Sequence, residues 1–178
     1  MQEVWPRLFQ AVRLRRDAFV WMDFNDRATG DALLLVVGTR VLLFLGFSGV
    51  GAIGVSLGWL EALFGTILGG VIFWLWFSGL SHVIGRYVFE GGTTFAATMR
   101  ISGFAYPTQL VQIAAAYFVS SLLAFLVAAV WFLAICAAGI HHTADLPNDK
   151  AWLTVIGAVA GYLAITAIFR GLFAGLPL

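Results

Sequence analysis

The chain has 178 residues, of which 61% are hydrophobic and 11% are charged, and its formal net charge is +1. A soluble domain of this size needs about a quarter of its residues charged to cover its surface. This composition, with a mean hydropathy of +0.95, therefore excludes a soluble globular domain. Ten of the nineteen charged residues lie in the first 31 positions. The rest of the chain requires lipid as its solvent, and we expect no nucleic-acid partner.

Residues 1–30 are predicted to form a cytoplasmic amphipathic segment that contains one helix over residues 3–22. The apolar side chains of this helix recur at helical spacing and share one face: Trp5, Leu8, Phe9, Val12 and Phe19. Arginines occupy the other side, and a helix of this kind is suited to lying flat among lipid headgroups. A helix packed against the loops of the membrane domain is the alternative.

Residues 31–178 are predicted to form a single all-α bundle of five transmembrane helices, because each crossing needs about 20 mostly apolar residues. The expected spans are residues 31–57, 61–89, 95–117, 117–140 and 150–173. Pro107 lies inside the third span and is predicted to kink it, since proline has no backbone N–H. A tight turn near residues 119–121 is expected to join the third span to the fourth.

The placement of basic residues predicts the orientation, because lysine and arginine are enriched in cytoplasmic loops. The five arginines of the N-terminal segment fall on one side of a five-span chain, together with Arg86, Arg100 and Lys150. The N-terminus is therefore expected in the cytoplasm and the C-terminus on the opposite side. Nine arginines against one lysine, with abundant alanine and glycine, are typical of GC-rich coding sequence. We accordingly expect a bacterial inner-membrane protein.

Two stretches of the chain carry a family resemblance. The first runs from Gly91-Gly-Thr-Thr-Phe95 through Arg100 to Gly103-Phe-Ala-Tyr-Pro107, and the second runs from Trp131 through Gly139-Ile-His-His142 to Lys150-Ala151. Together they resemble the Yip family, the Ypt-interacting membrane proteins with five spans, over residues 19–173. One departure is that Phe104 replaces the tyrosine that usually follows the glycine, while Tyr106 stands next to the proline.

The resemblance implies a polytopic protein whose eukaryotic relatives reside in secretory membranes and influence vesicle formation. Those relatives associate with prenylated Rab-type GTPases through a longer cytoplasmic N-terminal segment. This chain has only residues 1–30 there, so we do not expect it to bind a Rab-type GTPase. For bacterial members the resemblance implies a fold and a location, but no reaction.

Charged side chains inside a membrane span are costly, so each needs a partner or a purpose. We predict that four cationic side chains near the cytoplasmic leaflet bind an anionic lipid headgroup or a phospho-substrate: Arg40, His82, Arg86 and Arg100. Arginine binds phosphate with two parallel hydrogen bonds, and basic pockets between helices on the cytoplasmic side bind such headgroups. In the alternative interpretation the arginines extend to the interface or pair with Glu90 and Asp31.

Polar residues near the expected middle of the bilayer support a second hypothesis. Tyr106, Gln109 and Gln112 surround the predicted kink and could line a wet cavity in a small transporter or lipid scramblase. Hydrogen bonds that merely fix helix packing are the alternative. A third hypothesis is an accessory subunit or scaffold with a homo-oligomeric or membrane-protein partner. It is based on glycine pairs four residues apart: Gly65 with Gly69, Gly157 with Gly161, and Gly171 with Gly175.

The sequence contains no pattern that is typical of an enzyme. No nucleophile–base pair, phosphate-binding loop or redox motif is present, so we expect no cofactor. His141 and His142 lie near Asp145 and Asp149, but adjacent histidines are expected to point apart on a helix, and we expect no metal site. The sequence therefore favours a non-enzymatic membrane protein that acts through lipid or protein contacts in membrane organisation or a trafficking-like role.

Overall fold

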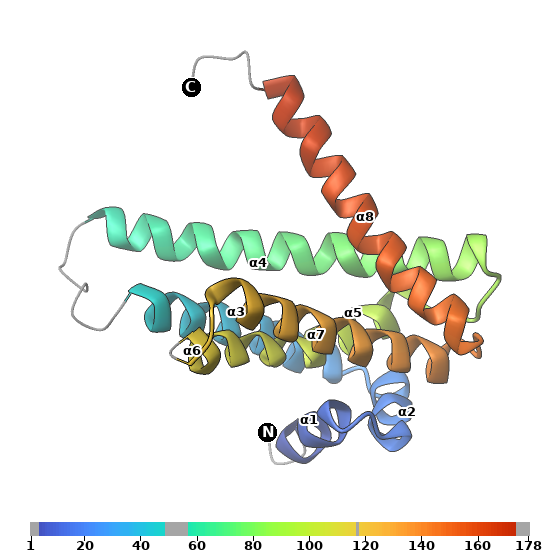
Figure 1. Ribbon diagram of the computed structural model, residues 1–178. Helices are drawn as coiled ribbons and strands as arrows, with labels where there is room; N and C mark the ends of the chain where they lie inside the picture. Colours follow the sequence, from blue (N-terminus) through green and yellow to red (C-terminus); the bar gives the residue numbers. More distant parts are fainter. Residues whose placement is uncertain (1–3, 49–56, 117, 174–178) are drawn as a thin grey trace.

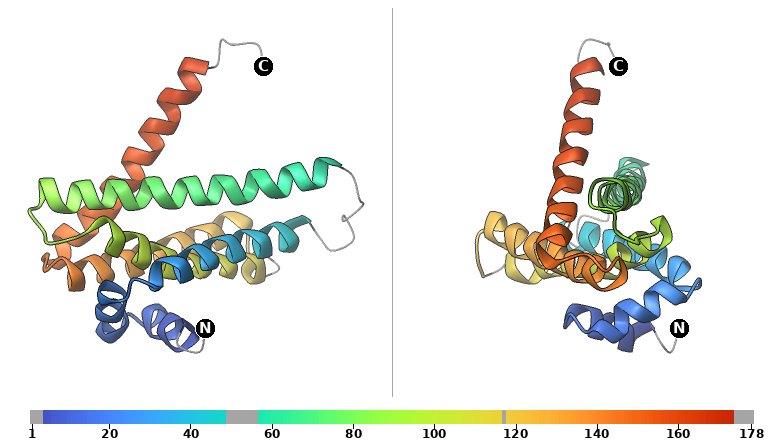
Figure 2. Two further views of the ribbon diagram at one scale, coloured as in Figure 1. Left: turned by 180° about the vertical axis from the view of Figure 1, so that it is seen from behind. Right: turned by 90° about the vertical axis from the view of Figure 1, so that its right-hand side faces the viewer.

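The computed structural model describes residues 4–48, 57–116 and 118–173, and its regular structure there is entirely helical (Figure 1). In chain order the elements are α1 (Val4–Val12), α2 (Arg16–Phe24), α3 (Ala28–Ser48), α4 (Leu57–Val83), η2 (Ile84–Val88), α5 (Phe95–Ala105), η3 (Tyr106–Leu110), α6 (Val111–Ala116), α7 (Ser121–Thr143) and α8 (Asn148–Phe173). The helices α3, α4 and α7 lie side by side around α5, while α8 crosses them near one end and then diverges (Figures 1 and 2). The pair α1–α2 packs on one side of this bundle.

Four helices in the described residues are long and apolar enough to cross a membrane. They cover Ala28–Phe47, Gly58–Val88, Ser121–Thr143 and Asn148–Leu172. The second covers 31 residues, or about 46 Å at 1.5 Å per residue, which exceeds a hydrocarbon layer of about 30 Å. Our sequence prediction counted five spans. The remaining predicted span, residues 95–117, is divided into α5, η3 and α6 and contains no single helix of sufficient length.

The segment changes from an α-helix to a 3₁₀-helix at Tyr106, beside Pro107, where a kink was predicted. Thr94 starts α5, because its side-chain oxygen accepts a hydrogen bond from the backbone N–H of Ala97 at 3.1 Å. At the other end of α5 the N–H of Tyr106 bonds to the carbonyl of Gly103, and Pro107 occupies the first turn of the 3₁₀-helix η3. Proline supplies no N–H to continue the α-helical ladder, so the chain tightens there.

The N-terminal segment forms two helices rather than the single helix predicted over residues 3–22. Leu14 has a φ of 57°, and the chain closes α1 with bonds from the N–H of Leu14 to the carbonyl of Ala11 and from Arg15 to Gln10, both 2.9 Å. This is the Schellman arrangement that ends a helix. Phe19 is consequently separated from the other four residues of the predicted apolar face, which lie together in α1. Leu8 and Phe19 are buried, whereas Trp5 and Phe9 are each 62% exposed.

This turn allows a test of its backbone strain. A left-handed conformation costs a residue other than glycine about 1–2 kcal/mol, so Leu14→Gly is expected to raise the free energy of unfolding by up to about 1 kcal/mol. Leu14→Val is expected to lower it, because branching at Cβ makes this conformation worse. Thermal unfolding of the purified protein in detergent measures both. Equal losses for the two variants would show that the leucine side chain, not the backbone, determines stability here.

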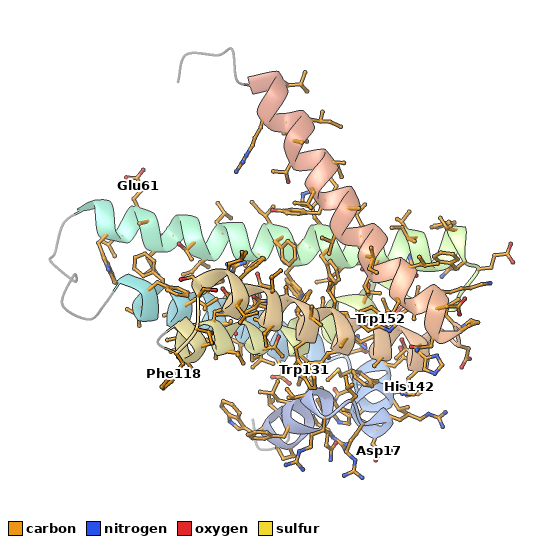
Figure 3. All side chains as sticks on the ribbon, in the orientation of Figure 1. Asp17, Glu61, Phe118, Trp131, His142 and Trp152 are labelled. Carbon is orange, nitrogen blue, oxygen red and sulfur yellow. The ribbon has the colours of Figure 1, made fainter. Side chains whose placement is uncertain are left out.

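Three parts of the chain meet at one end of the bundle, and each has a predicted cytoplasmic arginine or lysine in it or next to it. The connection from α4 to α5 touches the connection from α7 to α8, since the N–H of Gly92 donates to the carbonyl of Ala144 at 3.1 Å. The α2 helix joins them there through ring contact between Phe19 and His142, with centroids 5.9 Å apart. Figure 3 shows Glu61 at the opposite end of the bundle from His142. The end that holds α2 is called the basic end below.

Close helix contacts depend on glycine at several positions. A Cβ atom on Gly103 of α5 would lie 2.9 Å from the Cα of Ala32 in α3. Gly157 and Gly161 of α8 face Ile84 and Leu80, so this predicted glycine pair packs inside the bundle. A Cβ atom on Gly65 or Gly69 of α4, in contrast, would meet no atom within 4 Å, so this pair faces outward. The third predicted pair ends at residue 175, outside the described residues.

Candidate functional site

Arg100 joins the N-terminal helices to the core. It extends from the buried face of α5 and is only 5% exposed. Its Nε donates to the hydroxyl of Thr29 at 2.9 Å, and its Nη1 donates to the carbonyls of Met22 at 3.0 Å and Asp23 at 2.8 Å. Its Nη2 forms an ion pair with Asp26 at 2.7 Å. Four of the five guanidinium N–H groups are thus occupied, so Arg100 stabilises the fold instead of facing a headgroup.

Arg40 lies deeper in the bundle than the sequence suggested. Because α3 starts at Ala28 and not at Asp31, Arg40 is about 18 Å along the helix from its first residue. Its Nε and Nη2 donate to the hydroxyl of Tyr106 at 3.0 and 2.6 Å. That hydroxyl donates to the carbonyl of Gly70 at 3.2 Å. The chain of hydrogen bonds from α3 through η3 to α4 therefore lies within the membrane-embedded part of the bundle.

The backbone of α4 makes room for this arginine. A Cβ atom on Gly70 would lie 2.5 Å from Cγ of Arg40 and 2.8 Å from Cδ, so a larger residue would displace the side chain. The guanidinium carbon also stands 5.2 Å from the centroid of the Tyr106 ring, a distance at which a cation is attracted to an aromatic face. The single ion pair found in the described residues is Arg100 with Asp26. Arg40 has no carboxylate partner among them.

A pocket of about 320 Å³ opens beside Arg40. Its polar lining is Arg40, Thr66, Gln109 and Gln112, and its apolar lining is Leu43, Phe44, Phe47 and Phe125. The Gln112 side chain donates to the side-chain oxygen of Gln109, while Tyr106 is buried beneath the pocket behind Arg40. We call this site the Arg40 pocket. It brings the predicted polar residues of the third segment together with one predicted anion-binding residue.

The other two predicted cations lie toward the basic end. His82 is in the last turn of α4 and packs between the rings of Tyr87 and Phe95, at centroid distances of 6.3 and 6.4 Å. Its Nδ1 is buried without a hydrogen-bond partner among the described residues. Arg86 is exposed on the π-helix η2. The four predicted anion-binding residues consequently occupy three places and do not form one cluster.

A second polar pocket was not predicted. About 530 Å³ in volume, it lies at the basic end and is lined by Arg16, His141, His142, Asp145, Leu146 and Pro147. Nδ1 of His141 lies 2.6 Å from the carbonyl oxygen of Leu146, and the two histidine rings are 4.8 Å apart rather than pointing apart. The described residues contain no group of three or more side chains placed to hold a metal ion. The polar composition of residues 141–149 signalled a surface, but not its contact with α2.

Several residues that position these sites were also missed. Asp26 and Thr29 hold Arg100, and Gly70 and Thr66 border Arg40. Asp26 was treated as a turn residue, and the expected partners of the arginines were Glu90 and Asp31. The best signal available was the polar turn itself, because a buried arginine from elsewhere in the chain needs several oxygen acceptors in one place.

The long apolar helices and the polar groups enclosed between them define an integral membrane protein with multiple helical spans. A model of the Yip1 domain matches residues 12–169, which is most of the chain. The protein therefore belongs to the Yip1 domain family, as the resemblance indicated, and this trafficking-related family consists of non-enzymatic membrane proteins. No curated protein and no solved structure shows significant similarity to the chain.

Proposed function

We propose that this protein crosses the bacterial inner membrane five times and organises the membrane by holding anionic lipid at its cytoplasmic face. The third crossing is the divided segment α5–η3–α6. It starts at the basic end and reaches the opposite end, where Gly46 of α3 packs against Ile113 of α6. A break in a spanning helix is tolerated where protein surrounds it, and residues from Ile101 to Tyr106 are buried.

The orientation in this proposal places the basic end in the cytoplasm. Positive residues are retained on that side of a membrane, and the N-terminal arginines, Arg86 and Lys150 belong to the segments that meet there. Five crossings put the C-terminus on the opposite side. The α1–α2 pair is packed against the bundle, so lipid is the proposed partner and a Rab-type GTPase is not.

The surface of the α1–α2 pair carries the proposal. Trp5 and Phe9 of α1 are each 62% exposed and Phe24 of α2 is 83% exposed, although Arg100 fixes α2 to the bundle. Arg13 and Arg15 are exposed in the turn between the helices. Aromatic side chains beside arginines suit the boundary between acyl chains and anionic headgroups. The pair would therefore occupy the cytoplasmic leaflet alone and select anionic lipid.

Lipid selectivity tests this proposal. In mixed vesicles of phosphatidylglycerol and phosphatidylcholine, the purified protein is expected to retain phosphatidylglycerol preferentially, as measured by mass spectrometry of co-purified lipid. Each arginine near an anionic surface contributes about 1 kcal/mol, so the triple variant Arg13→Gln, Arg15→Gln, Arg16→Gln is expected to reduce the preference by about tenfold or more.

The matched control for this experiment is Arg170→Gln, which removes an exposed arginine from the last turn of α8. Its lipid preference is expected to equal that of the unmodified protein. Raising the salt concentration should weaken the preference of the unmodified protein and have little effect on the triple variant. An undiminished preference in the triple variant would refute a lipid-selecting role for the α1–α2 pair.

A further inference from the structure

Arg40 does not use all of its hydrogen-bond donors. Of its guanidinium nitrogens, Nε and Nη2 bond to Tyr106, whereas Nη1 has no hydrogen-bond partner among the described residues. Nη1 is not one of the buried side-chain atoms that lack a partner, so it is accessible. Arg40 also lines the open pocket. Because Nη1 carries two N–H groups, the pocket contains at least two available donors on a permanent positive charge.

The depth of Arg40 makes this arrangement costly unless an anion is present. An arginine at the centre of a spanning helix is disfavoured by roughly 2.5–3.5 kcal/mol on insertion scales, and its side chain does not deprotonate in proteins. The side chain of Arg40 does not extend along α3 to a membrane surface, because Tyr106 holds it across Gly70 of α4. The described residues provide a hydroxyl and an aromatic ring, but no carboxylate.

The remaining polar groups of the pocket favour an acceptor-rich ligand. The side-chain nitrogen of Gln109 has no bonded partner among the described residues, while the oxygen of Gln109 is already engaged by Gln112. The hydroxyl of Thr66 donates to the carbonyl of Ala62 at 2.8 Å, so its hydrogen is used. The free donors are the N–H groups of Arg40 Nη1 and the Gln109 amide, the free side-chain acceptor is the amide oxygen of Gln112, and no acidic side chain lines the pocket. Phosphate oxygens match such a set.

The apolar walls identify where the rest of the ligand would lie. Phe47 of α3 is 58% exposed and Phe125 of α7 is 51% exposed, and both line the Arg40 pocket. Phe47 lies one residue before the end of α3 at Ser48, and Phe125 lies in the second turn of α7, so both exposed rings border the pocket near these helix ends. We propose that the Arg40 pocket binds a phosphate group within the bilayer, supplied by an anionic phospholipid whose acyl chains contact Phe47 and Phe125. This site is separate from the α1–α2 surface.

Photochemical cross-linking tests the site directly. The purified protein is incubated with phosphatidylglycerol that carries a photoreactive acyl chain, and the labelled peptides are mapped by mass spectrometry. Labelling of the α3 and α7 segments around Phe47 and Phe125 is expected, and it should saturate with lipid concentration. Inorganic phosphate is added as a competitor, because a free phosphate could satisfy the same donors. Competition would assign the site to a small anion, and its absence would assign the site to lipid.

Two variants separate the Arg40 pocket from other lipid contacts. Arg40→Met is expected to reduce labelling at these segments by about tenfold or more, as loss of charge-assisted hydrogen bonds predicts, and to leave labelling of the α1–α2 segment unchanged. The double variant Gln109→Leu, Gln112→Leu retains Arg40 and should reduce labelling to a smaller extent, which keeps the test valid if Arg40→Met does not fold. Arg170→Met is the matched control and should label normally. Equal labelling in Arg40→Met and the unmodified protein would overturn the proposal, as would an equal loss in Arg170→Met.

Discussion

Replacing Arg100 with methionine is expected to lower the free energy of unfolding by about 3 kcal/mol and to release α1 and α2 from the bundle. The variant leaves the carbonyls of Met22 and Asp23 and the hydroxyl of Thr29 without their donor. A buried acceptor that loses its partner costs about 1–3 kcal/mol; the bond to Met22 is buried and the other two are partly buried. Methionine is about as long as arginine and is apolar, so it keeps most of the packing. The loss of stability therefore measures hydrogen bonding more than packing. Thermal unfolding in detergent gives the stability.

Limited proteolysis shows whether the helices are released. Trypsin cleaves after arginine, and the turn between α1 and α2 should become cleavable much faster in Arg100→Met than in the unmodified protein. Asp26→Asn is the control: the carboxylate of Asp26 is fully exposed, so its charge is screened by solvent and little change is expected. Arg100→Lys should be intermediate, since lysine offers a point charge and cannot reproduce the planar fork. A stable, protease-resistant Arg100→Met variant would contradict this account of the N-terminal helices.

The second large effect is expected from Gly103→Val, which should reduce stability by about 3 kcal/mol or prevent folding. The first added carbon would stand 2.9 Å from the Cα and 3.1 Å from the carbonyl oxygen of Ala32. These are backbone atoms of α3, so the contact is relieved only by moving one helix away from the other. Overpacking of a core costs about 1–3 kcal/mol, and a backbone neighbour places this variant at the upper end. The yield of folded protein and its melting temperature are the measurements.

Gly65→Ala provides the matched comparison on the same kind of residue. Nothing lies within 4 Å of a side chain added at Gly65, and alanine favours a helix over glycine by about 1 kcal/mol in water. Gly65→Ala is therefore expected to be neutral or slightly stabilising.

Ala32→Gly combined with Gly103→Ala should recover part of the stability lost in Gly103→Ala alone. Failure of this pair to show coupling would mean that the α3–α5 contact is not the cause.

Sequence reasoning located the membrane segments because their signal is local and strong. Four of the predicted apolar runs lie on the long helices α3, α4, α7 and α8, and Pro107 interrupts the remaining run where proline removes a donor. The tight turn expected near residues 119–121 appears at Phe118 to Ser120. These features depend on neighbours in the chain, so the sequence contains most of the information. The five crossings and the orientation remain predictions.

Helix boundaries and long-range partners were harder to predict. The first spanning helix was expected to start at Asp31, but the backbone N–H of Arg27 bonds to the Asn25 side chain at 3.1 Å and α3 begins at Ala28. This shift of three residues places Arg40 nearer to the middle of the bundle. Leu14 ended α1, although leucine rarely adopts a positive φ. No local pattern indicated either result.

The Arg40 pocket shows how partial predictions can combine. Arg40 was assigned to one hypothesis and Gln109 with Gln112 to another, since the two groups lie far apart in the chain. Helical periodicity cannot tell which residues of different helices face each other. The contact depends on Gly70 of α4, which permits the arginine to cross the helix surface. The grouping therefore required the three-dimensional structure.

The anchoring of the N-terminal helices by Arg100 has a consequence for biogenesis. Thr29 and Arg100 are 71 residues apart, so α1 and α2 leave the ribosome well before their anchor is synthesised. They cannot reach their final place until α3, α4 and α5 have been delivered by the insertion machinery. Their docking is therefore a late step in assembly, which can occur only after α3, α4 and α5 have packed together.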